Sequence, residues 1–343
     1  MSKTNNSSRE ASARARDVWK ESPDTIRLFL ERRPDYEQLC AEVAYILNKR
    51  LADKKIETAS ITWRAKTLKS FLEKIQRKNY QNPFTDITDF AGVRVVCLYI
   101  PDLSKIEEIL RDEFRVLEKV DKLNNKEPDE FGYGAVHFIV KLGGKSSGAR
   151  YDDLNYLTCE VQVRTVLQDA WAIIDHHLVY KQESDVPSQL QRKLNSLAGM
   201  FETADDQFQR VRSEREEYLQ NVKSSLRSKG EFLGNEVNKD SFAEYVRWKF
   251  PSLKPEYYKG QIGSILVSID RDKYRKLADI DADIEKGKTA LEIVNKELKG
   301  LKALPFGAVQ AALALSLTDE KSRRELMRDE PEIQPVIEAN IVR

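Results

Sequence analysis

The chain has 343 residues, of which 41% are hydrophobic and 33% are charged. This length allows two average domains with cores of their own, and the balance is typical of a water-soluble protein with much helix. The formal net charge of +1 does not require a nucleic-acid or membrane partner, so any such partner would have to bind a local patch.

No segment has the pattern of a secretory signal or of a membrane span. Residues 1–16 are polar and charged and contain no apolar stretch. The most apolar run, residues 303–317, is short and contains Pro305 and Gly307. We therefore expect a cytoplasmic protein without a membrane partner.

The three cysteines are far apart in the sequence. Cys40, Cys97 and Cys159 form no C-x-x-C pair, which argues against a structural zinc site. Isolated cysteines among apolar residues suit a reducing compartment.

The pattern along the first two thirds of the chain predicts helices, then a sheet, then helices. Residues 1–20 are polar and are expected to form a mobile tail. The order of elements indicates an α+β or α/β domain at residues 21–220. The predicted helices are 25–51, one after Thr67, 166–180 and 190–219, and the predicted strands are 93–100, 114–120, 135–142 and 157–165.

Residues 230–343 are predicted to form a smaller, mainly helical module after a polar linker at 220–235. Its aromatic and basic side chains fit either an accessory core with solvated lysines or a regulatory surface that binds RNA or a protein trigger. In a predicted helix from Ile280 onward, apolar residues recur at close to every seventh position. This helix could pack on residues 197–208 or on a second subunit, so a homo-oligomer is one alternative. The aromatic and basic residues are Phe242, Tyr245, Trp248, Phe250, Tyr257, Tyr258, Arg247, Lys249, Lys254 and Lys259.

Two carboxylates in the strand-rich block are candidates for metal-assisted chemistry on phosphate groups, which needs carboxylates for magnesium, cations for phosphate oxygens and a base. Asp89 precedes the first core strand, at an end where it can reach solvent. Glu160 shares the polar face of residues 157–165 with Gln162 and Arg164, because side chains alternate along a strand. That face is either the floor of an active site or an exposed sheet surface.

Cations precede these strands at regular spacing. Lys66, Ser70 and Lys74 recur every four residues, with Arg64 before them and Arg77 after them. Such a stripe can hold a triphosphate, although a solvated helix face has the same pattern. Further along, Tyr133 lies between Gly132 and Gly134, which allow a tight turn, and Tyr133 and His137 would share one side of an extended segment.

Taken together, these segments resemble the synthetase domain of RelA/SpoT alarmone enzymes, from about residue 62 to residue 182. Five motifs occur in order at the family's spacing, although none is specific alone. They are Arg64-x-Lys66-x-x-x-Ser70-x-x-x-Lys74, Asp89-Phe-Ala-Gly-Val-Arg94, Gly132-Tyr133-x-x-x-His137, Glu160-Val-Gln-Val-Arg-Thr165, and Ala170-Trp-Ala172 leading to His176 and Tyr180-Lys181.

The resemblance implies a nucleotidyltransferase-like mixed sheet flanked by helices. It implies that Asp89 and Glu160 hold Mg²⁺, with Glu160 also a candidate base for a ribose 3′-hydroxyl. Pyrophosphate would pass from ATP to that hydroxyl and AMP would leave. The ATP side would comprise Arg64, Lys66, Ser70, Lys74, Arg77 and Arg94, with Arg64 and Arg94 on the adenine, and the acceptor side would comprise Tyr133, His137 and Arg164.

The acceptor loop departs from the family pattern at three positions. Asp129 replaces the family's lysine, Phe131 its asparagine and Ala135 its serine. An anion in place of a cation should weaken binding of an acceptor's 5′-phosphates. The first hypothesis is therefore alarmone synthesis on GDP or GTP. The alternatives are a toxic synthetase that modifies the 3′ end of tRNA, a role that would suit phage defence, and a non-catalytic nucleotide-sensing module.

The hydrolase domain that accompanies some members of the family is not expected in this chain. It needs several histidines and a His-Asp pair, whereas this sequence has only His137, His176 and His177.

Overall fold

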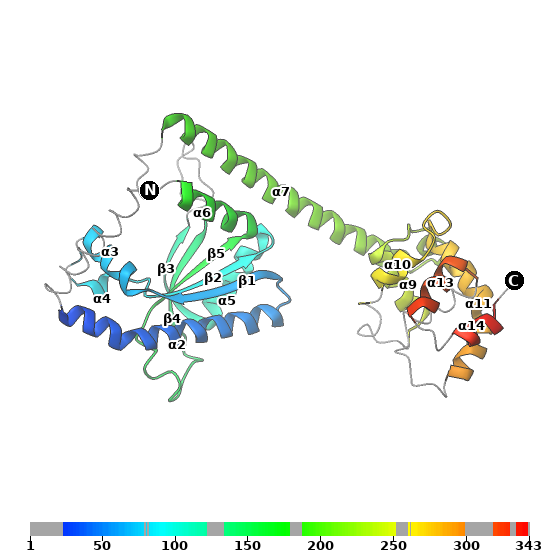
Figure 1. Cartoon of the computed structure of the whole chain (residues 1–343), viewed down its shortest axis with the longest axis horizontal. Coiled ribbons are helices and arrows are strands. Elements are labelled where there is room, and N and C mark those ends of the chain that lie inside the picture. The colour runs from blue at the N-terminus through cyan, green and yellow to red at the C-terminus, as the bar shows by residue number, and fades with distance from the viewer. Residues whose placement is uncertain are drawn as a thin grey trace. The chain divides into compact units, whose positions relative to one another are not determined.

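The computed structural model describes residues 23–78, 80, 82–121, 134–178, 187–251, 260, 262–298, 318–329 and 334–341. The chain divides into two compact units, Met1–Val211 and Arg212–Arg343. The first contains a sheet flanked by helices and the second is mainly helical (Figure 1). The predicted α+β class with a smaller helical C-terminal part is therefore confirmed. The predicted tail at 1–20 lies outside the described residues.

The sheet of the first unit is mixed, with five strands in the order β1-β2-β5-β4-β3. β2 and β5 are parallel neighbours, while the other neighbouring pairs are antiparallel. β2 and β5 are rich in valine, as expected for strands that are covered by helices. The strands are β1 (Thr58–Ala65), β2 (Ala91–Cys97), β3 (Phe114–Asp121), β4 (Val136–Leu142) and β5 (Cys159–Thr165).

The first predicted strand ends earlier than the sequence pattern suggested. β2 stops at Cys97, and helix α5 (Ile100–Glu113) begins three residues later. Pro101 lies in the first turn of α5, where its fixed φ favours a helix start and its missing N–H costs nothing. The apolar run from Val93 to Ile100 therefore contains both a strand and the start of a helix. β1, at the edge of the sheet, was not predicted.

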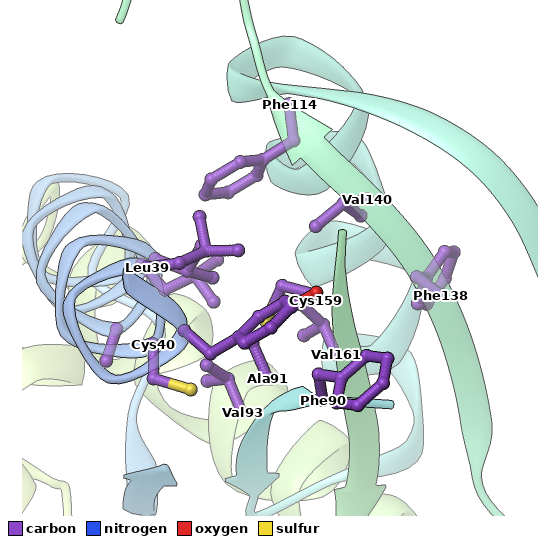
Figure 2. Packing of buried hydrophobic residues seen from close by; sticks show 14 of the residues in the cluster. Leu39, Cys40, Phe90, Ala91, Val93, Phe114, Phe138, Val140, Cys159 and Val161 are labelled. Atoms are coloured by element: carbon purple, nitrogen blue, oxygen red, sulfur yellow. The ribbon is translucent and has the colours of Figure 1, made fainter. Parts of the chain in front are cut away.

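One face of the sheet packs against helices α2 (Pro23–Asp53) and α5 and forms the main core. Figure 2 shows Leu39 and Cys40 of α2 beside Val93 and Val161 of the central strands. These side chains are at most 1% exposed. Burying each of the larger aliphatic ones contributes roughly 1.5–3 kcal/mol relative to exposure.

An aromatic cluster fixes the segment that enters β2. Phe90 is buried and stacks on Tyr36 of α2 at 4.8 Å and on Phe84 at 5.6 Å. Phe84 belongs to the short helix α4 (Pro83–Asp86), and Phe71 of α3 (Leu68–Lys78) joins the same cluster. Because Phe90 is anchored in this way, the adjacent residue Asp89 is held at the entry of β2.

The opposite face of the sheet contacts helix α6 (Val166–Leu178), which follows β5 directly. Trp171 of α6 packs with Leu194 and Ala198 of helix α7 (Ser188–Ser225). The hydroxyl of Thr165 donates a buried hydrogen bond of 2.6 Å to Asp205 of α7. α7 supplies residues to both compact units.

The second unit has a helical core of its own, to which the end of α7 contributes Val222. The predicted linker at 220–235 is wrong, because α7 continues to Ser225 and α8 follows, with Val222 and Phe232 fully buried. Its polar composition reflects the outer faces of these helices. The helices are α8 (Lys229–Leu233), α9 (Lys239–Lys249), α10 (Ile262–Ser268), α11 (Leu277–Leu298), α13 (Glu320–Asp329) and α14 (Gln334–Ala339).

The start of the seven-residue repeat in α11 packs inside the second unit. Ile280 and Ile284 are buried in the same core as Phe242 and Tyr245 of α9. This packing favours the accessory-core interpretation for that part of the aromatic cluster, whereas Lys254, Tyr257, Tyr258 and Lys259 lie outside the described residues. Among the helices that the structure describes, none combines the length and apolar character needed to cross a membrane.

Candidate functional site

The polar face of β5 continues across its neighbours. In the parallel pairing, Gly92 is opposite Glu160 and Arg94 is opposite Gln162. β1 places Arg64 opposite Gly92, and β4 places His137 opposite Gln162. Residues that are directly opposite in a sheet point to the same side. Four strands therefore bring Arg64, Arg94, His137 and Glu160 onto one face, although they are far apart in the sequence.

Asp89 is bound by two lysines of the predicted stripe. Lys66 Nζ lies 2.8 Å from Asp89 Oδ2, and Lys74 Nζ lies 2.9 Å from Asp89 Oδ1. Burial alone would raise the pKa of Asp89, but the hydrogen bonds and charges of the two lysines outweigh it and lower the pKa. Asp89 is therefore a carboxylate at neutral pH, and both its oxygens already have cationic partners.

The backbone fixes Lys66 and Lys74 relative to Asp89. Lys66 N donates a 2.7 Å hydrogen bond to the carbonyl of Phe90, which joins the end of β1 to the start of β2. Thr67 directly precedes α3 and caps it, because the Thr67 hydroxyl accepts a hydrogen bond from Ser70 N. Lys74 follows two turns later on the same helix, so both ammonium groups reach the same carboxylate.

Glu160 is the second carboxylate of the polar face. His137 Nδ1 lies 2.9 Å from Glu160 Oε1, and Gln162 Nε2 donates to Oε2 at 2.9 Å. An ionised carboxylate only accepts hydrogen bonds, so the Nδ1 atom of His137 must carry the proton. Burial raises the pKa of Glu160, and the negative charge of Asp89 also raises it. The hydrogen bonds from His137 and Gln162 lower the pKa by more than these two effects raise it. The net shift is downward, and Asp89 and Glu160 are close enough to interact.

A third acidic residue, Asp169, lies in the first turn of α6. Its Oδ1 atom is 3.1 Å from Arg94 Nη1 and 3.4 Å from Arg164 Nη1. Arg164 is almost completely buried and donates a 2.8 Å hydrogen bond to Gln162 Oε1. Burial and, to a smaller extent, the charge of Arg94 lower the pKa of Arg164. Because the ordinary pKa of arginine is far above neutral pH, Arg164 stays protonated.

These groups surround a pocket of about 380 Å³. Its lining contains two carboxylates and several cations, which suits a phosphate-rich ligand with a divalent metal. The size is within the range of small-molecule sites. The lining residues are Thr62, Trp63, Arg64, Ala65, Lys66, Thr67, Ser70, Asp89, Gly92, Val93, Arg94, Glu160 and Gln162.

Six of the candidate residues line this pocket, and others support it from behind. Lys74 and His137 hold the carboxylates, whereas Arg164 is buried beneath the face rather than lining the pocket. Arg77 is exposed on α3 and does not line the pocket. Tyr133 lies outside the described residues, as do Asp129 and Phe131. The six lining residues are Arg64, Lys66, Ser70, Asp89, Arg94 and Glu160.

Two residues of the site were not among the sequence candidates. Gln162 was placed on the polar face but given no role, although its alternation with Glu160 was a usable signal. Asp169 gave no signal, because its contacts depend on where α6 crosses β2 and β5.

The donor set fits magnesium better than a metal held entirely by protein. The described residues contain no cluster of three or more His, Cys, Asp or Glu side chains that could hold a metal. Two carboxylates on one pocket, Asp89 and Glu160, are nevertheless sufficient for Mg²⁺, which usually keeps waters and binds substrate phosphates.

An α+β fold with carboxylates and cations facing one pocket defines a class of proteins that bind or transfer phosphate groups. Residues 63–185 match a family model described as a region found in RelA / SpoT proteins. The chain therefore carries a RelA/SpoT-type synthetase domain, and the resemblance drawn from the five motifs is confirmed.

Curated relatives match the same part of the chain. GTP pyrophosphokinase YwaC of Bacillus subtilis (strain 168) is 27% identical over 157 residues, covering 44% of this chain and 72% of the relative. GTP pyrophosphokinase YjbM of the same organism is 29% identical over 161 residues, covering 46% and 73%. Among solved structures, a GTP pyrophosphokinase family protein from Streptococcus pneumoniae is 24% identical with a TM-score of 0.47, covering 55% of this chain and 95% of that one.

Proposed function

We propose that this chain is a pyrophosphokinase that transfers pyrophosphate from ATP to the ribose 3′-hydroxyl of GDP or GTP, making (p)ppGpp. The observation that carries the proposal is the meeting of Asp89 and Glu160 in one pocket with Arg64, Lys66 and Arg94. The names of the two curated relatives, both GTP pyrophosphokinases, support it.

In this reaction the acceptor 3′-oxygen attacks the β-phosphorus of ATP. The bond between the β-phosphorus and the oxygen bridging to the α-phosphorus breaks, and AMP leaves. The proton of the hydroxyl passes to Glu160, the proposed base, whose carboxylate is held in place by His137 and Gln162. Since the pKa of Glu160 is lowered, it is ready to accept a proton at neutral pH.

On the donor side, we assign Arg64 and Arg94 to the adenine and Lys66 and Lys74 to the phosphates of ATP. Ser70 and Arg77, on the same helix as Lys74, are assigned to the phosphates as well. Arg77 is exposed, so its side chain must move to reach them. ATP phosphates compete with Asp89 for the two ammonium groups, so binding of ATP releases Asp89 oxygens. Bound Mg²⁺, held by Asp89 and Glu160, would neutralise the charge that develops on the phosphates.

On the acceptor side, Tyr133 is assigned to stacking on the base, with His137 beside the ribose. Arg164 is assigned to this side through Gln162, because it is buried and its guanidinium donates to that amide. The acceptor loop, with Asp129 and Phe131, favours a second candidate, the 3′ end of tRNA, since such an acceptor has no 5′-triphosphate to bind at this loop.

Incubating the protein with Mg²⁺, labelled ATP and either GDP, GTP or bulk tRNA separates these functions. Labelled guanosine 3′-diphosphate product supports alarmone synthesis, and label on tRNA supports the second candidate. ATP binding without transfer to any of the three would favour the non-catalytic nucleotide-sensing module. The double change Asp129→Lys with Phe131→Asn should shift use toward GTP or GDP relative to tRNA. An unchanged preference would show that this loop does not select the acceptor.

We also infer that the second unit regulates the first or binds a protein trigger or RNA. α7 begins on the synthetase domain and ends in the core of the second unit, so it connects them covalently through one helix. A chain truncated after Val211 should retain ATP binding and lose any response to the partner. A truncated chain whose transfer still responds to that partner would contradict the inference.

A further inference from the structure

Asp169 takes part in the site without lining the pocket. It lies one turn into α6, its side chain is one-fifth exposed, and a single oxygen, Oδ1, contacts both Arg94 and Arg164. Arg94 lines the pocket beside Gln162, whereas Arg164 is only 7% exposed. Asp169 is therefore the anion shared by one arginine that faces the pocket and one that is buried beneath it.

The two arginines need this anion. The charge of Arg94 acts unfavourably on Arg164, which has already lost much of its hydration. A buried guanidinium without a carboxylate partner is strongly destabilising. The carboxylate of Asp169 offsets both effects and defines one direction for each guanidinium group.

Arg164 in turn determines the orientation of the Gln162 amide. A guanidinium group has only donors, so Gln162 must present its oxygen to Arg164, as the 2.8 Å distance to Oε1 shows. Its amino group then points at Glu160, to which it donates at 2.9 Å. If Arg164 were displaced, the amide could rotate and present its oxygen to the carboxylate, which would repel it.

The support for this arrangement is rigid. The side chain of Gln168 accepts a hydrogen bond from Thr165 N at 2.8 Å, and Gln168 N donates to the hydroxyl of Thr165. The same hydroxyl donates to Asp205 of α7. These buried bonds fix the junction between β5 and α6, and therefore the distance from Asp169 to the sheet.

We propose that Asp169 is a positioning residue that serves both halves of the site, holding Arg94 toward the ATP adenine and, through Arg164 and Gln162, holding Glu160 toward the acceptor hydroxyl. The inference rests on the proposed function, and it adds a residue and a pathway to it. The relevant contacts run without interruption from Arg94 to Asp169, Arg164, Gln162, Glu160 and His137.

The test compares Asp169→Asn with Arg164→Gln, using Glu202→Gln on the exposed surface of α7 as a control for the loss of one charge. Calorimetry with ATP alone measures the donor half and the fraction of active protein, and kcat per active site with both substrates saturating measures the orientation of Glu160. In Asp169→Asn, the Kd for ATP should rise about tenfold, because Arg94 loses its ionic anchor. kcat should also fall, by about tenfold, because Glu160 loses the hydrogen bond from Gln162 that orients its carboxylate.

Arg164→Gln should also lower kcat but leave the Kd for ATP within about twofold, since Asp169 still holds Arg94. A merely structural role for Asp169 would lower the fraction of active protein without changing either readout. If folded Asp169→Asn bound ATP normally and kept the kcat of the wild type, the proposal would be overturned. If Asp169→Asn is unstable, Asp169→Glu, which keeps the charge but displaces it, must still weaken ATP binding.

The proposal and the proposed function fail in different ways. ATP affinity is measured without an acceptor, so it reports on Arg94 and Asp169 even if no acceptor is ever modified. Absence of transfer by the wild type to GDP, GTP and tRNA would overturn the proposed function. Equal ATP affinity of the wild type and Asp169→Asn would overturn the role of Asp169 on the donor side.

Discussion

Both units contain partly buried carboxylates paired with basic side chains, but the two sets differ in what surrounds them. Asp89 and Glu160 of the first unit keep 27% and 20% of their side chains exposed and line a pocket. Asp281 and Asp283 of the second unit are only 8% and 7% exposed. A buried ion pair alone therefore does not indicate a reactive site.

The pairs in the second unit fix α11 to α9 and to the loop that precedes α11. Asp281 of α11 accepts hydrogen bonds from Tyr245 at 2.9 Å and from Lys249 at 2.5 Å, both on α9. Asp283 accepts from Tyr274 at 2.8 Å. Burial and the adjacent carboxylates raise the pKa of both tyrosines, so these phenols stay protonated as donors. The same residue types thus stabilise packing in one unit and face a ligand-sized pocket in the other.

The largest difference between the units should appear on neutralising their carboxylates. Asp89→Asn or Glu160→Gln should reduce transfer by on the order of a thousandfold or more, because each removes a proposed metal ligand. Thermal unfolding should stay close to that of the wild type. Asp153→Asn, in an exposed loop, is the matched control. Near-normal turnover by either folded variant would refute the assignment.

The division of the pocket into two halves predicts separate kinetic effects. Arg94→Ala should raise the KM for ATP about tenfold, since it removes a charged and stacking contact. Tyr133→Ala should instead impair use of the acceptor by about 1–3 kcal/mol if a base stacks there. Steady-state kinetics with each substrate varied in turn distinguishes the two. A Tyr133→Ala variant that affected ATP alone would invert the assignment.

In the second unit, the comparison predicts a loss of stability without loss of chemistry. Asp281→Asn should lower the free energy of unfolding of that unit by about 1–3 kcal/mol, because the partly buried Lys249 loses its ion pair with Asp281 and, among the described residues, keeps an ion pair with Glu285 alone. Transfer in the absence of any partner should be unchanged. Asp272→Asn, at a 95% exposed position, is the control, and both variants are measured by urea unfolding and by transfer. A Asp281→Asn variant of normal stability would show that the pair contributes little to the core.

A smaller effect is expected from Asp205, which joins α7 to β5. Burial, reinforced by the charge of Asp206, raises the pKa of Asp205 from 3.8 to about 7. Between these values the folded protein binds more protons than the unfolded chain, so this group makes the free energy of unfolding fall as pH rises.

Asp205→Asn removes this dependence while keeping an oxygen that can accept from Thr165. The variant should therefore gain stability relative to the wild type between pH 5 and pH 8, by on the order of 1 kcal/mol. Urea unfolding at both pH values measures this change. A difference between variant and wild type that is independent of pH would mean that Asp205 does not titrate in this range.

Sequence pattern predicted those parts of the site that depend on short-range periodicity. Glu160 and Gln162 share a face because strands alternate, and Ser70 and Lys74 share a face of α3 because they are four residues apart. The same reasoning could not find Asp169, which meets Arg94 only because α6 crosses the sheet. Such a contact is set by packing of distant segments.

In the second unit, the sequence pattern failed to predict part of the hydrophobic core. Val222 and Phe232 are fully buried, yet they are separated by mostly polar residues that resemble a linker. The end of α7 and α8 contribute few buried side chains, so no local window at 220–235 contains enough apolar residues to predict this part of the core. In contrast, the central strands of the first unit can be predicted from their composition, because they are rich in valine.

The account's central claim is that a whole pyrophosphate group is transferred, and the products of ATP provide its most direct test. With ATP, Mg²⁺ and the acceptor that proves active, chromatography of the reaction should show AMP appearing in equal amount to an acceptor that carries two added phosphates. Formation of ADP with an acceptor carrying one phosphate would identify a phosphokinase and contradict the account.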